Sequence, residues 1–234
     1  MKMVIFDLDG TLAEQGEPIP SSACEALLSL ERQGVQVVFC SGKPTYYLAA
    51  MARQVGLKNV ALIGETGFAV QIGTQLPPEA YHEKMISPET RAFLLDLADL
   101  IRREVQRVWF QPNSGPLTVF FYDDAGKARL DELLRQSVAE RDDVLLFAQP
   151  DCFDVTPAVT KADGIAWLLK RESVSEMDVI YVGDGENDQP AFDVIPCSIA
   201  IDPERKLRAQ QHVETLDEAL RTVMELTRQG GISQ

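Results

Sequence analysis

Short apolar runs that end in polar, glycine-containing loops recur near both ends of the chain. They are rich in β-branched side chains, which predicts buried strands over residues 3–6, 35–39, 59–63, 177–182 and 198–201. Apolar positions at helical spacing predict helices over residues 22–33, 44–55, 162–170, 189–193, 203–210 and 216–228. Strands that alternate with helices form a parallel sheet with crossover helices, so the predicted fold class is α/β with a Rossmann-like parallel sheet core.

The pattern changes in the middle of the chain. A hairpin is expected over residues 68–72 and 81–86, and beyond it helices are expected over 88–106 and 127–140, each followed by two short strands. Those strand pairs fall at 107–111 with 117–122, and at 144–148 with 152–155. The order α-β-β-α-β-β favours a small antiparallel sheet with two helices on one face. We therefore expect an α+β domain of residues 87–156, inserted into an α/β core domain of residues 1–86 and 157–234.

Charge and cysteine content narrow the class of protein. The chain has 234 residues with 36 acidic and 22 basic side chains, giving a net charge of −14 that is spread along the sequence. This charge disfavours binding to nucleic acid or to an anionic membrane, although a bound cation would still admit small anionic substrates. The cysteines at 24, 40, 152 and 197 form no C-x-x-C motif and are expected as free thiols in the cytoplasm. Asp7 and Asp9 interrupt the first apolar run, and we expect neither a secretory segment nor a membrane span.

Two acidic motifs directly follow predicted strands. Asp7 and Asp9, in the run Asp-Leu-Asp-Gly-Thr, lie on the same side of an extended segment where open α/β sheets bind ligands. Two like charges this close require a cation or a shared proton, unless the loop is simply solvated. The run of residues 183–188, Gly-Asp-Gly-Glu-Asn-Asp, has the donors and glycines of a metal or anion loop, or of an exposed acidic turn.

Two further features lie at predicted helix starts. Ser41 and Gly42 offer a hydroxyl and backbone N–H groups of the kind that bind phosphate, although an ordinary helix cap has the same composition. Lys161 precedes the helix of residues 162–170 and is, taken alone, a surface lysine. All four features lie at strand ends or helix starts of one predicted sheet.

The order DxDGT, SG, K, GDxxND resembles the haloacid dehalogenase-like superfamily of phosphohydrolases. An insertion between the second and third motifs is similar to the branch with a type II cap. This branch includes Cof-like sugar phosphatases, sucrose-phosphate phosphatase, archaeal-type phosphoglycolate phosphatase, mannosyl-phosphoglycerate phosphatase and phosphomannomutase. The resemblance implies a Mg²⁺-dependent phosphatase that hydrolyses a small phosphorylated metabolite through an aspartyl phosphate.

The resemblance also implies a role for each motif residue. Asp7 would be the nucleophile, and Asp9 the general acid and then the general base. The implied phosphate-binding residues are Ser41, Gly42, Lys161 and Asn187, and the implied metal ligands are Asp7, Asp9 through its carbonyl, Asp184 and Asp188.

Some positions depart from the family pattern. Lys43 stands where many relatives have arginine, Ala162 where glycine is usual, and Thr66 replaces the asparagine of a Glu-Asn-Gly stretch. None of these removes a catalytic group. Two other functions stay open: a phosphomutase-type phosphotransferase, and a non-enzymatic metabolite-sensing module on the same fold.

Overall fold

The chain forms two compact units in the structure, a computed structural model that describes residues 1–229. One unit joins Met1–His82 to the chain from Thr160 onward, and the other is Glu83–Val159. The sequence analysis placed the insert at residues 87–156. Each unit has its own buried apolar cluster, so each is described by itself.

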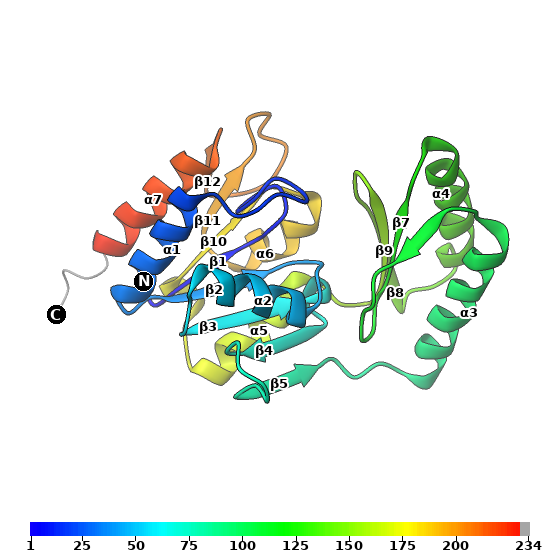
Figure 1. Ribbon diagram of the computed structural model, residues 1–234, viewed down its shortest axis with the longest axis horizontal. Helices are drawn as coiled ribbons and strands as arrows, with labels where there is room; N and C mark the ends of the chain where they lie inside the picture. The colour runs from blue at the N-terminus through cyan, green and yellow to red at the C-terminus, as the bar shows by residue number, and fades with distance from the viewer. Residues whose placement is uncertain (230–234) are drawn as a thin grey trace. The chain divides into compact units, whose positions relative to one another are not determined.

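The first unit is built on a single sheet whose strand order is β12-β11-β10-β1-β2-β3-β4-β5 (Figure 1). The pairs from β12 to β3 are parallel, and β4 runs antiparallel to β3. The strands are β1 (Met3–Phe6), β2 (Gln36–Cys40), β3 (Val60–Gly64), β4 (Ala69–Ile72), β5 (Ala80–Glu83), β10 (Val179–Gly183), β11 (Cys197–Ile201) and β12 (Gln211–Val213). The predicted α/β class with a parallel core sheet is therefore confirmed.

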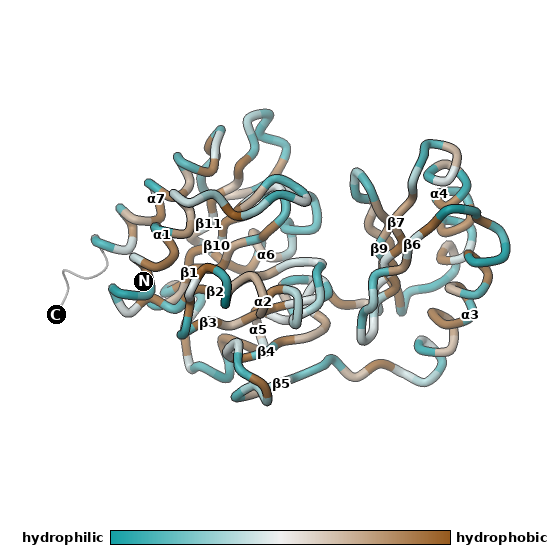
Figure 2. The backbone as a smooth tube through the Cα atoms, in the orientation of Figure 1, coloured by the Kyte–Doolittle hydropathy of each residue, from teal (hydrophilic) through white to brown (hydrophobic). Residues whose placement is uncertain are grey.

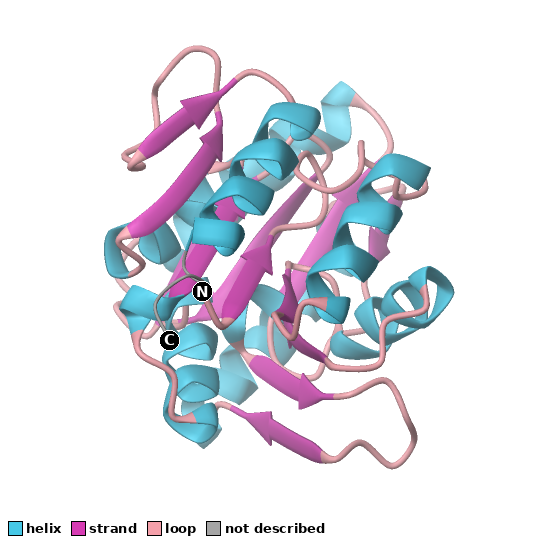
Figure 3. Ribbon diagram, turned by 90° about the vertical axis from the view of Figure 1, so that its left-hand side faces the viewer, coloured by secondary structure: helices cyan, strands magenta, loops and turns pink. Residues whose placement is uncertain are grey.

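Helices cover both faces of this sheet (Figure 3). Alternate strand residues point to opposite faces: Val4 and Phe6 pack with one set of helices, and Met3 and Ile5 with the other. The first set is α1 (Ser21–Arg32), α2 (Thr45–Val55) and α7 (Leu216–Gln229), and the second is α5 (Lys161–Glu172) and α6 (Gln189–Val194). Because both faces are covered, the central strands β1, β3 and β10 are almost wholly apolar, and Figure 2 shows this part of the chain mainly in brown.

The prediction of a helix over residues 203–210 is wrong. This segment consists of turns and bends, and it leads into β12, which the sequence analysis did not predict. Arg205 has a left-handed backbone with φ 54°, which ends any helix at that point. The carboxylate of Asp202 then accepts a hydrogen bond from Leu207 N at 2.7 Å and holds the loop in this form.

The second unit has an antiparallel sheet of order β6-β7-β9-β8 with both of its helices on one face. Its elements are α3 (Pro88–Glu104), β6 (Val108–Phe110), β7 (Leu117–Phe121), α4 (Asp124–Val138), β8 (Val144–Ala148) and β9 (Cys152–Pro157). This is the predicted α-β-β-α-β-β order. Helix α4 begins three residues before the predicted start because Asp123 caps it, accepting from Gly126 N at 2.8 Å.

Strand β9 places polar groups on the face of the small sheet that the helices leave open. Phe153 and Val155 pack with α3 and α4, so Asp154 points the other way. Its carboxylate accepts from the Thr118 hydroxyl at 2.5 Å, and that hydroxyl accepts from the Asn113 amide at 2.8 Å.

In the part of the chain that the structure describes, no helix is long and apolar enough to span a bilayer.

Candidate active site

Strand β1 delivers Asp7 to the carboxyl-end edge of the sheet. All four strand residues are fully buried, and β1 lies between β10 and β2. The backbone continues past the strand with Asp7 N donating to Val182 O at 2.8 Å, so Asp7 stays in register with β10. Asp7 is 5% exposed, which makes it a buried carboxylate that needs partners.

The glycine and threonine of the first motif serve Asp184. Gly10 has φ +86°, and a Cβ at this position would lie 2.2 Å from Asp184 Oδ2. The Thr11 hydroxyl donates to Asp184 Oδ1 at 2.8 Å. The loop after β1 thus accommodates the carboxylate that follows β10.

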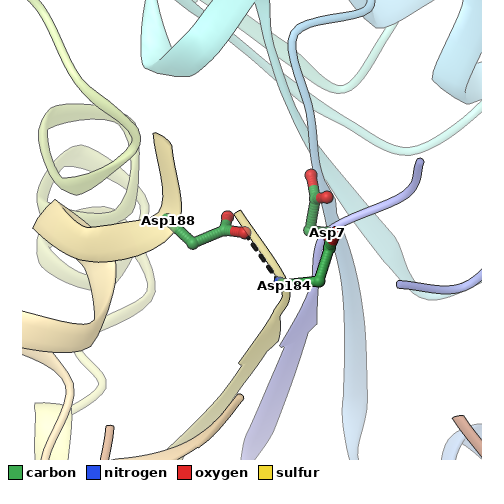
Figure 4. A group of neighbouring side chains, drawn as sticks. All are labelled: Asp7, Asp184 and Asp188. Carbon is green, nitrogen blue, oxygen red and sulfur yellow. Dashed lines mark hydrogen bonds between the residues drawn. The ribbon is translucent and has the colours of Figure 1, made fainter. Parts of the chain in front are cut away.

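The second motif folds back on itself around Asp188. A Cβ on Gly183 would lie 2.5 Å from Asp188 Cγ, so only glycine allows this approach. Asp188 Oδ2 accepts from the backbone N–H groups of Asp184 and Gly185, each at 3.0 Å. Figure 4 shows Asp7 after β1, and Asp184 and Asp188 after β10, with the bond between the latter two dashed.

Lys161 is the first residue of α5 and is 0% exposed. The Asp163 carboxylate accepts from Thr160 N at 2.9 Å and fixes the start of the helix. Glycines at 67 and 164 allow this helix start to pack closely, since a Cβ on Gly67 would lie 2.0 Å from Thr160 O. The alternative that Lys161 is an ordinary surface lysine is therefore wrong.

The ammonium of Lys161 bridges two carboxylates. Its Nζ donates to Asp7 Oδ1 at 2.6 Å and to Asp188 Oδ1 at 2.5 Å. Burial by itself would lower the pKa of Lys161, but the charges of Asp188 and Asp7 outweigh burial and raise it. The lysine is therefore a fixed positive charge beside Asp7.

One ammonium does not balance the carboxylates around it. Burial raises the pKa of Asp7 well above its usual range, and the charges of Asp188 and Asp184 raise it further, against the lowering effect of Lys161. Burial and the charge of Asp188 also raise the pKa of Asp184. These carboxylates would ionise more readily with a second cation between them.

The donor set fits a hard divalent cation. Asp7, Asp184 and Asp188 each offer a carboxylate oxygen, and these oxygens lie within 4.8 Å of one another. Carboxylate oxygens are the ligands that Mg²⁺ prefers in proteins. The Asp9 carboxylate is not in this group; it forms an ion pair with Lys43, Nζ to Oδ2 3.4 Å.

The remaining predicted residues lie at neighbouring strand ends. Ser41 directly follows β2, is buried, and accepts from Lys43 N at 3.1 Å through its hydroxyl oxygen, which leaves the hydroxyl hydrogen to donate elsewhere. Gly42 follows it and is half-buried, as is Asn187 in the turn Glu186–Asp188. Among the hydrogen bonds of the described residues, those of the Asp7–Lys161–Asp188–Asp184 cluster do not include Ser41 or Asn187.

Comparison with known proteins bears on this constellation. A family model for haloacid dehalogenase-like hydrolases matches residues 4–114 and 111–215, which is most of the chain. The chain belongs to this family.

Individual relatives in the family are distant. A phosphoglycolate phosphatase of Nitrosopumilus maritimus is 25% identical over 197 residues, covering 83% of this chain and 80% of the relative. A haloacid dehalogenase-like hydrolase from B. subtilis has a TM-score of 0.75 at 16% identity, with 96% of this chain and 98% of that chain covered. A sugar phosphatase of haloacid dehalogenase subclass IIB has a TM-score of 0.73 at 18% identity, covering 97% and 99%. The last two show a shared fold.

The sequence analysis did not assign the contacts of two residues of this haloacid dehalogenase-like site. Thr11 was counted as part of the first motif but was given no partner. Tyr181 was placed in a buried strand, yet its hydroxyl donates to Asp188 Oδ1 at 2.5 Å. The available signal was a hydroxyl-bearing ring in an otherwise aliphatic strand, directly before the Gly-Asp-Gly motif.

Proposed function

We propose that this chain is a Mg²⁺-dependent phosphatase that acts on a small phosphorylated metabolite through an aspartyl phosphate. The observation that carries the proposal is the contact of Asp7 Oδ1 with Lys161 Nζ at 2.6 Å, at the carboxyl ends of β1 and β10. A nucleophilic carboxylate needs positive charge beside it to approach a phosphate dianion. The neighbouring carboxylate of Asp184 supports the proposal because it would help to hold a cation at this place.

The proposed chemistry uses two carboxylates in turn. An oxygen of Asp7 attacks phosphorus and displaces the alcohol, whose oxygen takes a proton from Asp9. Water then attacks the phosphorus of the aspartyl phosphate while Asp9 accepts its proton, which releases orthophosphate and restores Asp7. The Lys43 ammonium forms an ion pair with Asp9, so the proposed acid has a positively charged neighbour.

The other residues hold charge and orientation. The Ser41 hydroxyl, the Gly42 amide, Lys161 and the Asn187 amide would bind phosphoryl oxygens. Mg²⁺ would be held by Asp7, Asp184 and the carbonyl of Asp9, with Asp188 beside them, and would supply further charge neutralisation of the phosphoryl group.

The substrate class follows from relatives rather than from geometry. Relatives named phosphoglycolate phosphatase and a sugar phosphatase of the same fold support a phosphorylated hydroxy acid or a sugar phosphate. We propose that the inserted unit selects between them.

A phosphate-release screen tests the proposed function. The purified chain is assayed with phosphoglycolate, a panel of sugar phosphates, nucleotides, pyridoxal phosphate and p-nitrophenyl phosphate, with Mg²⁺ or with EDTA. We expect release of orthophosphate with Mg²⁺ from at least one small ester, and none from Asp7→Asn. Phosphate transfer between sugar positions that requires a bisphosphate activator would favour the phosphomutase instead, and full activity in EDTA would contradict the metal requirement.

A further inference from the structure

The largest fully buried side chain in the described part of the molecule contacts the candidate active site. Tyr181, on β10, is 0% exposed, and its strand neighbours are aliphatic apart from the glycine that ends the strand. A buried phenol hydroxyl needs a hydrogen-bond partner, and this one lies 2.5 Å from Asp188 Oδ1. A phenol carries a proton and a carboxylate offers only lone pairs, so Tyr181 is the donor in this hydrogen bond.

This hydroxyl completes the set of donors around Asp188. Oδ1 accepts from Tyr181 Oη and from Lys161 Nζ, both at 2.5 Å. Oδ2 accepts from the backbone N–H groups of Asp184 and Gly185. A carboxylate offers about four lone-pair directions, and here protein donors occupy all four. Asp188 is therefore held by four protein donors, and it lies close to Asp7 and Asp184.

A fixed Asp188 in turn fixes Lys161. The two backbone donors and the phenol hold the plane of the carboxylate, so Oδ1 lies at a set position. Lys161 Nζ binds there with one proton and reaches Asp7 Oδ1 with another. Without the phenol, Oδ1 would keep a single, charged donor, and the position of the ammonium between Asp188 and Asp7 would be less firmly set.

We propose that Tyr181 is a positioning residue whose hydroxyl, acting through Asp188, holds Lys161 in contact with the nucleophile Asp7. The proposal rests on the proposed phosphatase function for its kinetic consequence. Its structural part, the hydroxyl's hold on the lysine, can be measured without turnover.

The kinetic test compares two conservative variants. Tyr181→Phe removes the hydroxyl and keeps the ring. Phe192→Leu alters the ring packing, because Phe192 meets Tyr181 edge-on with centroids 5.4 Å apart, and leaves the hydroxyl in place. With p-nitrophenyl phosphate and saturating Mg²⁺, we expect Tyr181→Phe to lower kcat by about 10-fold or more, the loss that follows from one hydrogen bond to a charged group, with KM nearly unchanged. Phe192→Leu should lower the melting temperature and keep kcat within about twofold.

The second test needs no activity. In EDTA, urea unfolding is measured for Tyr181→Phe, Lys161→Met and the double variant. If the hydroxyl acts on the lysine through Asp188, the two destabilising effects do not add, whereas those of Phe192→Leu and Lys161→Met do. Additive effects of Tyr181→Phe and Lys161→Met, or a kcat for Tyr181→Phe within twofold of the parent, would overturn the proposal. A parent that releases no phosphate but shows the coupling would refute the proposed function and leave the hydroxyl's hold on Lys161 established.

Discussion

Replacement of Lys161 by methionine isolates the charge at the centre of the site. Methionine keeps the length and most of the volume of the side chain, so packing around this fully buried position changes little. What is lost is the ammonium that lies 2.6 Å from Asp7 Oδ1 and 2.5 Å from Asp188 Oδ1. Two buried carboxylates then lose their shared counter-charge.

The size of the effect follows from the burial of all three groups. Removing one member of a buried ion pair typically costs about 3–5 kcal/mol, because the remaining charge is left uncompensated. At about 2–4 °C per kcal/mol for a chain of this length, Lys161→Met should lower the melting temperature in EDTA by about 6–20 °C. Lys170→Met, an exposed lysine on the same helix, is the control and should change stability by less than about 0.5 kcal/mol.

The loss should also depend on pH. Without Lys161, the carboxyl of Asp7 has a folded-state pKa raised above its unfolded value, since burial and repulsion by the neighbouring carboxylates are then unopposed. The folded state therefore binds more protons than the unfolded state, and stability falls as pH rises above about 4, the unfolded value. The destabilisation by Lys161→Met should be larger at pH 8 than at pH 5. A loss below about 1 kcal/mol at pH 8, or one equal to that of Lys170→Met, would refute the assignment of Lys161 as the buried counter-charge.

Three further predictions follow from the geometry. Asp9→Asn should lower steady-state turnover of p-nitrophenyl phosphate by about 10²–10⁴-fold, the range for general acid–base catalysis, and near-normal turnover would exclude Asp9 from that role. Gly10→Ala should displace Asp184 and weaken Mg²⁺ binding, which calorimetry measures. The control is Gly16→Ala, which has a similar φ of +79° but nothing within 4 Å of its Cβ, and which should affect stability alone. Equal Mg²⁺ affinities of the two variants would contradict the contact between Gly10 and Asp184. Asn113→Ala breaks the chain of hydrogen bonds to Thr118 and Asp154 and should change kcat/KM for the best natural substrate more than for p-nitrophenyl phosphate; an unchanged ratio would argue against substrate selection by this unit.

Much of the fold was predictable because its signals are local. Strand β1 is a short apolar run with a polar end, and the segment from Pro88 to Glu104 shows helical spacing with a proline at its start. The segment 203–210 also begins with proline, but Arg205 adopts a left-handed conformation that Asp202 and its backbone contacts stabilise. Such a contact is not visible in a pattern of apolar positions.

The chemistry of the site was predictable in its residue types and not in its pairings. Asp7 and Asp184 are distant in sequence and meet because β1 and β10 are neighbours in the sheet. Lys161 joins them from the start of α5, which packs closely on Gly67. Thr11 and Tyr181 have ordinary structural interpretations as a turn residue and a core aromatic. Their roles appear only when their hydroxyls are seen to contact Asp184 and Asp188.

Chemical trapping of the phosphorylated side chain tests the central claim, that Asp7 is the nucleophile, most directly. The chain is mixed with Mg²⁺ and p-nitrophenyl phosphate, quenched, and treated with borohydride, which reduces an aspartyl phosphate to homoserine. Peptide mass spectrometry then locates the modified residue. We predict homoserine at position 7 only when both substrate and Mg²⁺ are present, and none in Asp7→Asn. Release of phosphate with unmodified Asp7, or homoserine at another aspartate, would contradict the account.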